Sequence, residues 1–469
     1  MNSKVLFPVI LFLISLKVSG QSNPVISKRD FRTDNPGFDA AWKHLDAGDE
    51  LYRSGGLYYS KALEHYKISL LYNPGNAELN YKSGIAALMS DRKEEAANYL
   101  AKAYKIKNNV TGDVLLYWGL SLGYQSKFSR ADSVLNLYLA SDVRKSRAEI
   151  KKAERCIVES KAGIQLLNDP VNALIRNAGI AINSPSDDYS PVLSSDGLLI
   201  YYASRRPTEI SQKSRYKDAK FDENIYYSKW IDTAWSVGVN AGKNINTEFN
   251  ESPLFMDLPG EHLYIYAGYE GAGDILVSEL RRGGWKVPVA EDFGINSKGA
   301  ETSICISPDG TEIAYVSDRG KGSMGGSDIY FIEKKGKRRW TRPVNAGDGI
   351  NSEYNEESVR YSKGGDTLWF SSTGHNSIGG YDIFFSVRNK SGEWEKCRNA
   401  GIPVNSAWND WFFLQSTKDN DLYYFVSDRA GGLGGMDIYT CKIPAGIDTK
   451  PPIDKTPAIP VKLEEDTGK

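Results

Sequence analysis

Short apolar runs of the kind that form β-strands recur at a regular spacing in the second half of the chain. Each unit contains Asn or Asp followed by Ile and then by an aromatic residue or Leu. These segments begin at Asn224, Asp274, Asp328, Asp382 and Asp437, which are 50, 54, 54 and 55 residues apart. A period of about fifty residues with several short β runs per unit is typical of β-propeller blades rather than of a solenoid.

A repeated Asn closes each unit, and the two ends of the repeat array complement each other. The closing residues are Asn183, Asn246, Asn296, Asn351 and Asn405. Residues 171–184 match only the closing strand of a unit, whereas the last unit ends soon after Asp437 without such a strand. We therefore expect the first segment to supply the outer strand of the last blade, because ring closure removes exposed strand edges. This arrangement predicts five blades, with residues 206–221 forming a polar loop rather than a sixth blade.

Residues 38–168 show the apolar spacing of three and four that predicts amphipathic helices. Small residues recur in pairs, namely Gly48 with Ala62, Gly84 with Ala96, and Gly119 with Ala131. The Ala positions are 34 and 35 residues apart, and this pattern resembles tetratricopeptide repeats, whose paired helices touch through small residues. A charged helix at about 142–167 is interpreted as a solenoid cap, or alternatively as a docking face for an acidic partner.

The expected fold class is a multidomain α plus all-β protein, and its domain boundaries follow from these patterns. Residues 1–20 resemble an export signal, with Lys4 before an apolar run that is too short to span a bilayer. A linker is expected at 21–37, the helical repeats at 38–168, the propeller at 169–444 and a flexible tail at 445–469. We therefore expect an exported, periplasmic protein without a transmembrane segment, peripheral to the outer membrane.

Charge and reactive residues narrow the function. The chain has 58 basic and 59 acidic residues, so no nucleic-acid partner is expected. Its four Cys have no metal-type spacing, and unpaired thiols are favoured over a Cys397–Cys441 bridge. The four His are not part of any known motif, so we predict no catalytic residue, no metal, no cofactor and no enzymatic activity. The Asp before each repeated Ile is interpreted as an acceptor that ties the preceding loop, not as a calcium ligand.

A carboxylate follows each closing Asn by five residues, immediately before the first strand of a blade. The five are Asp188, Glu251, Glu301, Glu356 and Asp410. They are predicted to surround one mouth of the central channel, where they would bind a cation, an amine or a basic side chain of a partner. The alternative is that they pair with the repeated Arg205, Arg319 and Arg429 or accept hydrogen bonds from nearby backbone N–H groups.

Aromatic residues break the symmetry of the repeats near the same strands. Trp408 and Trp411 stand out, and Tyr354 and Phe249 occupy the position of Trp408 in two other units. One hypothesis is an exposed patch for a partner or a sugar ring. The other is packing between blades.

The units resemble TolB-like, WD-repeat-like propellers of the bacterial envelope. The resemblance rests on Ser-Pro-Asp-Gly at 307–310, Ser-Asp-Arg at 317–319 and Gly-Gly-Ser-Asp-Ile-Tyr at 325–330. Helical repeats before such a propeller, behind an export signal, are similar to the PorE type of protein in Bacteroidota. The resemblance implies partners among outer-membrane components of type IX secretion or gliding. That family typically continues into an OmpA-like domain, which is not expected here, so either a partner held by the tail provides the anchoring or the chain is a shorter relative with another role.

Three hypotheses follow. The first is a non-enzymatic scaffold that assembles envelope proteins through its helical groove and propeller face. The second is a module that binds glycan or cell-wall fragments through the aromatic residues near Trp408 and the ring of carboxylates. The third is a hydrolase, which requires two acids about 5 to about 10 Å apart and a raised pKa in at least one.

Overall fold

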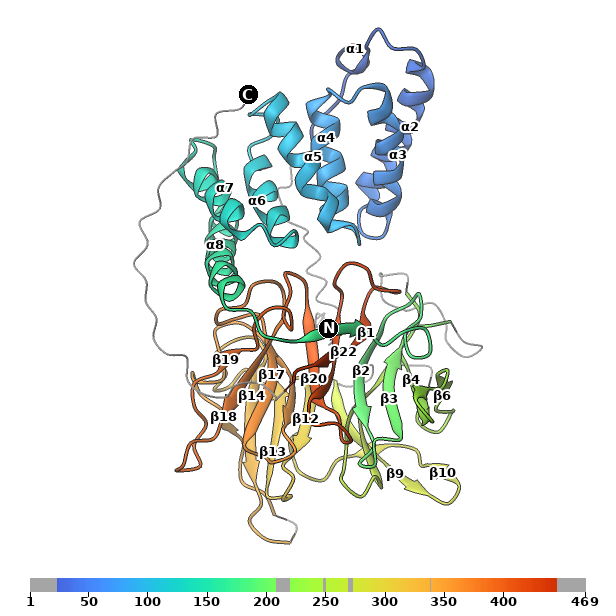
Figure 1. The fold of residues 1–469 in the computed structure, drawn as a ribbon, viewed down its shortest axis with the longest axis vertical. Helices are drawn as coiled ribbons and strands as arrows, with labels where there is room; N and C mark the ends of the chain where they lie inside the picture. Colours follow the sequence, from blue (N-terminus) through green and yellow to red (C-terminus); the bar gives the residue numbers. More distant parts are fainter. Residues whose placement is uncertain (1–22, 208–219, 248–249, 269–272, 338, 445–469) are drawn as a thin grey trace, which may run out of the picture.

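The computed structural model describes residues 23–207, 220–247, 250–268, 273–337 and 339–444. Within these ranges, eight helices precede a five-bladed propeller, and the helices lie on one side of it (Figure 1). The predicted fold class and blade number are therefore confirmed. The expected signal peptide at 1–20, most of the loop at 206–221 and the tail at 445–469 lie outside the described residues.

The helices form antiparallel pairs whose members meet at glycines. The bounds are α1 Lys28–Phe31, α2 Phe38–Ser54, α3 Tyr58–Tyr72, α4 Ala77–Leu88, α5 Lys93–Ile106, α6 Val114–Tyr124, α7 Phe128–Ala140 and α8 Arg147–Asn168. A Cβ atom added at Gly48, Gly84 or Gly119 would lie 2.7, 2.5 or 2.5 Å from a side chain of the paired helix. The predicted contact of paired helices through small residues is thus present in all three pairs.

Part of the expected linker adds to this helical core. Residues 28–31 form α1, and the side chain of Phe31 is fully buried. Its ring packs against Phe38, Trp42 and Tyr72 at centroid distances of 6.3, 5.8 and 5.3 Å. The helical core therefore begins before Phe38.

Each blade is an antiparallel sheet whose first strand lines the channel. Blade 1 contains β2 Asp188–Leu193, β3 Leu199–Ser204, β4 Asn224–Ile231, β5 Ala234–Trp235 and β6 Val239–Asn240. Blade 2 contains β7 Glu251–Met256, β8 His262–Ala267, β9 Asp274–Arg281, β10 Gly284–Trp285 and β11 Val289–Ala290. Blade 3 contains β12 Glu301–Ile306, β13 Glu312–Ser317, β14 Asp328–Glu333 and β15 Val344–Asn345; blade 4 contains β16 Glu356–Tyr361, β17 Thr367–Ser372, β18 Asp382–Val387 and β19 Arg398–Asn399. Blade 5 contains β20 Asp410–Gln415, β21 Leu422–Ser427 and β22 Asp437–Lys442.

The ring closes through β1, Leu174–Asn177, which is the outer strand of blade 5. This strand pairs antiparallel with β22, and the register places Ile175 opposite Cys441. The predicted closure by the N-terminal segment is confirmed. It makes the last blade depend on residues that precede the first blade in sequence.

The repeated closing Asn fastens the end of each blade to its third strand. In blade 3, Asn351 Oδ1 accepts a hydrogen bond from Ile329 N–H at 2.8 Å, and its Nδ2 donates to Ile329 O at 2.9 Å. The amide also donates to Asn345 Oδ1 at 2.8 Å. The other four closing Asn residues form the same two bonds to the backbone of a repeated Ile.

We expect Asn351→Ala to destabilise the protein by about 1–3 kcal/mol, because it leaves both polar backbone groups of buried Ile329 without these partners. Urea unfolding measures the loss. Asn108→Ala, at an exposed position between α5 and α6, is the control and should change stability by less than about 0.5 kcal/mol. Equal stability of the Asn351 variant and the wild type would contradict this role.

The repeated Asp residues tie the glycine-rich loops, as the sequence predicted. Asp328 accepts hydrogen bonds from Met324 N–H and Gly325 N–H, and Asp437 accepts the equivalent bonds from Leu433 and Gly434. All four cysteines are free, so the alternative bridge between Cys397 and Cys441 is absent. None of the described helices is long and apolar enough to cross a membrane.

The helical part docks on the propeller face at which the innermost strands begin. Arg155 of α8 donates to Thr373 O at 2.7 Å and His375 O at 3.2 Å, both in the loop between β17 and β18. The same guanidinium pairs with Glu159 at 2.9 Å, and burial raises the pKa of Glu159. Part of the charged helix expected to cap the repeats is therefore an interface with the propeller.

Candidate functional site

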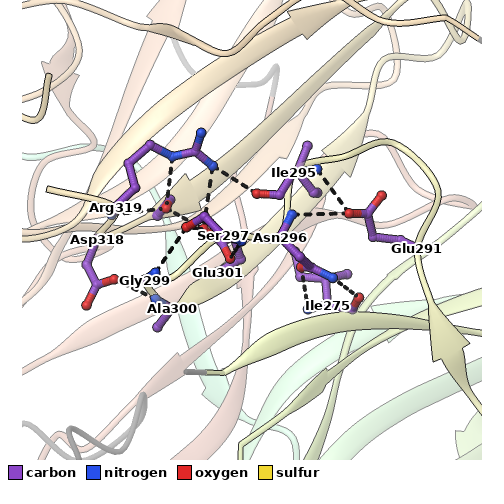
Figure 2. Close-up of polar contacts among 11 residues, drawn as sticks. Ile275, Glu291, Ile295, Asn296, Ser297, Gly299, Ala300, Glu301, Asp318 and Arg319 are labelled. Carbon is purple, nitrogen blue, oxygen red and sulfur yellow. Dashed lines mark hydrogen bonds and ion pairs between the residues drawn. The ribbon is translucent and has the colours of Figure 1, made fainter. Parts of the chain in front are cut away.

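The five repeated carboxylates lie at the starts of the innermost strands, with exposed fractions of 0–5 %. Glu301 is representative: its carboxylate accepts hydrogen bonds from Ser297 N–H at 2.8 Å and Ser297 Oγ at 2.7 Å (Figure 2). The residue four positions earlier provides both bonds in every blade. Burial raises the pKa of Glu301, and it raises the pKa values of Glu251 and Glu356 to about 7. These carboxylates are hydrogen-bonded inside the fold rather than presented to a ligand.

Three of the five carboxylates also pair with an arginine. Arg319 contacts Glu301 at 3.5 Å (Figure 2), and Arg429 contacts Asp410 at 2.5 Å. In blade 1 the partner of Asp188 is Arg206, at 2.7 Å, and not the expected Arg205. The side chain of Arg205 instead donates from Nε to Phe221 O, whereas Arg206, like Arg319 and Arg429, is the second residue after the Ser that ends the second strand of its blade.

The three aromatic residues that the structure describes, Trp408, Trp411 and Tyr354, do not form one patch. Trp408 is 6 % exposed and packs against Tyr124 of α6 at a centroid distance of 5.2 Å, in the interface between helices and propeller. Tyr354 lies beside Arg155, with 4.7 Å between the guanidinium carbon and the ring centroid. Trp411 is partly exposed and contacts Tyr381, whereas Phe249 lies outside the described residues.

Symmetry is broken instead where neighbouring blades meet at the channel mouth, which we define as the end at which the innermost strands begin. At each blade junction, the residue before the third strand of one blade lies next to the second residue of the following innermost strand. The pairs from junction 1/2 to junction 5/1 are Glu223 with Ser252, Gly273 with Thr302, Ser327 with Glu357, Tyr381 with Trp411, and Met436 with Tyr189. A feature that maintains the repeat would be the same at all five junctions, and these pairs differ in charge, size and polarity.

Junction 1/2 holds a buried carboxylate. Glu223 Oε2 accepts a hydrogen bond from Ser252 Oγ at 3.0 Å, and its carboxylate lies beside the hydroxyl of Tyr189. Burial raises the pKa of Glu223, and the positive charge of Arg205 opposes this effect. The group is thus held near a cation within the propeller mouth.

Junction 3/4 holds a second carboxyl with partial solvent exposure. Glu357 Oε2 accepts a hydrogen bond of 2.6 Å from Thr302 Oγ1, across to blade 3. Burial raises the pKa of Glu357 to about 8, although the hydrogen bond from Thr302 acts to lower it. At neutral pH this carboxyl therefore retains its proton and can donate a hydrogen bond.

Small residues occupy junction 2/3, between the two carboxyls. Gly273 and Thr302 meet here, and Gly299 and Ala300 stand before the innermost strand. The other blades place Asp or Asn at the position of Ala300, and in each of them that side chain accepts a backbone N–H from the preceding blade. Ala300 has no side-chain acceptor, so this link is missing at junction 2/3.

An aromatic pair at junction 4/5 borders Glu357. The rings of Tyr381 and Trp411 lie 5.4 Å apart between centroids. Burial is the main cause of the raised pKa of Tyr381, and the negative charge of ionised Glu357 is the next. The two side chains therefore lie close together. The mouth therefore combines a protonated carboxyl, a hydroxyl and an aromatic pair, groups that suit a neutral polyhydroxylated ligand.

The sequence contains a signal for these residues, because they share one position of the repeat and differ in type. Aligning the five innermost strands places Tyr189, Ser252, Thr302, Glu357 and Trp411 in one column, of which only Trp411 was singled out. Glu357 directly follows Glu356, and the repeat pattern marks only Glu356. Glu223 follows the loop at 206–221, and its position relative to Ser252 depends on contact between blades. Within the described ranges, no group of His, Cys, Asp and Glu residues could hold a metal ion.

We expect Glu357→Gln to remove a pH dependence of stability. The folded-state pKa of about 8 exceeds the ordinary value of 4.5, so the folded protein holds this proton more tightly than the unfolded chain. The stability contributed by this group is complete below about pH 4.5 and is lost as pH rises through about 8. Urea unfolding at pH 5 and pH 8.5 should show a smaller decrease for the variant than for the wild type. Exposed Glu353→Gln is the control, and parallel profiles for all three proteins would contradict the assignment.

Comparison with known proteins shows no family for this chain. No family model matches the chain, and no curated protein matches it. A solved glycoside hydrolase is 9 % identical, with a TM-score of 0.41 over 60 % of this chain and 94 % of that chain. The β-1,2-mannobiose phosphorylase of Listeria innocua is 8 % identical (TM-score 0.38, 59 % and 98 %). The periplasmic gluconolactonase of Pseudomonas aeruginosa is 10 % identical (TM-score 0.32, 55 % and 89 %). The propeller part of the envelope-protein resemblance agrees with the structure, and its family assignment is not supported by a match.

This comparison corrects the prediction that the protein is not an enzyme. The prediction rested on the absence of catalytic motifs in the sequence. The solved structures similar to this chain include a glycoside hydrolase, a phosphorylase and a gluconolactonase, which contradicts that exclusion. At these TM-scores the similarity concerns fold alone and assigns no reaction to this chain.

Proposed function

We propose that the protein binds a carbohydrate at the mouth of its propeller channel. The observation that carries the proposal is the loss of repeat symmetry at the blade junctions, where Glu357, Thr302 and Trp411 replace one another at equivalent positions. A carboxyl that keeps its proton near neutral pH donates a hydrogen bond to a sugar hydroxyl, and an aromatic ring packs against the apolar face of a pyranose. The expected export signal at 1–20 supports a location in the cell envelope, where glycans are abundant.

The test is binding of the purified protein to an array of oligosaccharides that includes peptidoglycan fragments, followed by titration calorimetry with each ligand retained. We expect Glu357→Gln and Trp411→Leu to weaken binding about tenfold each, since each removes one direct ligand contact. Glu353→Gln, at an exposed position near the same mouth, is the matched control. The mixtures are also analysed for shortened or rearranged glycans, which records any turnover. Binding that none of the mouth variants changes would overturn the proposal.

A second candidate function is assembly with envelope proteins, including outer-membrane secretion or gliding components. It is favoured by apolar side chains exposed on the second helix of each pair, Leu71 on α3, Ile106 on α5 and Leu137 on α7, with exposed fractions of 84, 44 and 48 %. Because α8 is fixed to the propeller through Arg155, such a partner would be held in one orientation relative to the channel mouth. The expected partner is a protein with a complementary apolar surface.

Cross-linking in intact cells tests this second candidate. We expect recovery of a stoichiometric envelope protein linked near α3, α5 or α7, and loss of that protein in Leu71→Glu. The control is Leu258→Glu, since Leu258 is also exposed but lies in the turn between β7 and β8. Equal recovery from both variants would remove this surface from consideration.

A further inference from the structure

Arg360 is a charged residue at a position that is otherwise apolar. It is the fifth residue of the innermost strand β16, and the equivalent residues of the other blades are Val192, Phe255, Cys305 and Leu414. Its side chain is only 6 % exposed. A single charged residue in a column of apolar residues is therefore a departure that the repeat itself does not require.

The guanidinium of Arg360 lies inside the channel. Its Nη1 donates to Val359 O at 2.7 Å and contacts Ser303 Oγ and Ile304 O of blade 3 at 3.4 and 3.5 Å. Its Nη2 donates to Leu254 O of blade 2. Blades 2 and 4 are not neighbours in the ring, so a side chain of blade 4 reaches the innermost strand of blade 2 only by crossing the channel.

The acceptors around Arg360 are all neutral. Within the described ranges, no carboxylate pairs with this guanidinium, and its Nε–H has no acceptor. Burial lowers the pKa of Arg360. A buried cation without a countercharge destabilises a fold, and an arginine that served only to join blades would need no unused donor.

We propose that Arg360 binds the carboxylate group of a ligand that enters the channel. The Nε–H lies on the same edge of the planar guanidinium as one N–H of Nη2, and that edge matches the two oxygens of a carboxylate. The channel provides the confined, partly desolvated surroundings in which such a pair is strong. Two sources supply this chemistry, an acidic sugar or a small free carboxylate. This site uses different residues from the channel mouth, so its test does not depend on the proposed carbohydrate binding.

Thermal unfolding of the full-length chain tests the inference, with sodium glucuronate, sodium acetate, methyl glucoside and sodium chloride as probes at constant ionic strength. A ligand that binds only the folded protein raises Tm, by about 3–5 °C at tenfold its Kd for a domain of this size. We expect glucuronate to raise the Tm of the wild type. Methyl glucoside and chloride have no carboxylate, so neither should raise the Tm through Arg360. Acetate separates the sources: a rise with acetate identifies a site for free carboxylate, and a rise with glucuronate alone identifies an acidic sugar.

Variants keep the test independent of the structural role of Arg360. Arg360→Gln should abolish the carboxylate-induced rise, Arg360→Lys should retain part of it, and exposed Arg282→Gln should leave it unchanged. A lower starting Tm of Arg360→Gln is not evidence for binding, because the side chain also joins three blades. The inference is overturned if no carboxylate raises the wild-type Tm above the chloride control, or if Arg360→Gln responds as the wild type does. If Arg360→Gln does not fold, the wild-type and Arg360→Lys series still decide the question.

Discussion

Trp408→Ala is expected to destabilise the protein by about 3–5 kcal/mol and to uncouple the helical part from the propeller. The indole is buried against Tyr124, and Lys93 Nζ lies 4.5 Å from the ring centroid. With Phe128, Ala162 and Ile378 it forms the apolar cluster that joins the two parts. Truncation to Ala leaves a cavity in that interface, and the polar contacts of Arg155 beside it become accessible to water.

Two measurements check this prediction. Urea unfolding should change from one transition to two, because the helices and the propeller no longer stabilise each other through the cluster. Limited proteolysis should cut the connection between α8 and β1 faster than in the wild type. Arg147→Ala, at an exposed position of the same helix α8, is the control and should alter neither result. A single transition at wild-type stability would show that the interface does not couple the two parts.

Ile175→Cys is expected to form a disulfide with the free Cys441 and to stabilise the propeller by about 2–4 kcal/mol. The two residues are opposite each other where β1 pairs with β22. Ala178 N–H donates to Ile438 O, and alternation along an antiparallel ladder makes Ile175 and Cys441 a non-hydrogen-bonded pair, the closer type. Such a spacing accommodates a disulfide, and this one would close a loop around the whole propeller.

The bond is detected as faster migration on a non-reducing gel and as a higher urea midpoint that returns toward the wild-type value after reduction. Burial raises the pKa of Cys441 to about 12, so oxidation should be carried out during refolding, when this thiol is accessible. Leu174→Cys is the matched control, since its partner across the ladder is Lys442. A disulfide in the control, or none in Ile175→Cys, would contradict the register of the closing strand.

Features that recur in every unit could be predicted from the sequence. The period of the Asn/Asp–Ile segments gave the blade number, and the unmatched strand at 171–184 gave the closure by β1. Asp328 and Asn351 form local bonds within one unit, so their roles follow from their position in the repeat. The glycines of the helical pairs belong to this group too, since a close contact of two helices requires a residue without a side chain.

The candidate site was less accessible to sequence reasoning. The recurrence of the five carboxylates predicted a binding rim at the channel mouth, and the structure places them in hydrogen bonds within the fold. The residues that distinguish the channel mouth are those that do not recur, Glu223, Glu357 and Trp411. Whether such a residue faces a ligand depends on its neighbour in the next blade, which lies about fifty residues away in the chain.

The sequence by itself determined a helical repeat region followed by a closed five-bladed propeller, because each of these features depends on periodic local patterns. Only the tertiary structure decided that Trp408 belongs to the interface with the helices and that Arg360 crosses the channel. These outcomes depend on contacts between segments that are distant in sequence. Such contacts depend on how whole blades and helices pack, and the periodic pattern of the sequence does not predict them.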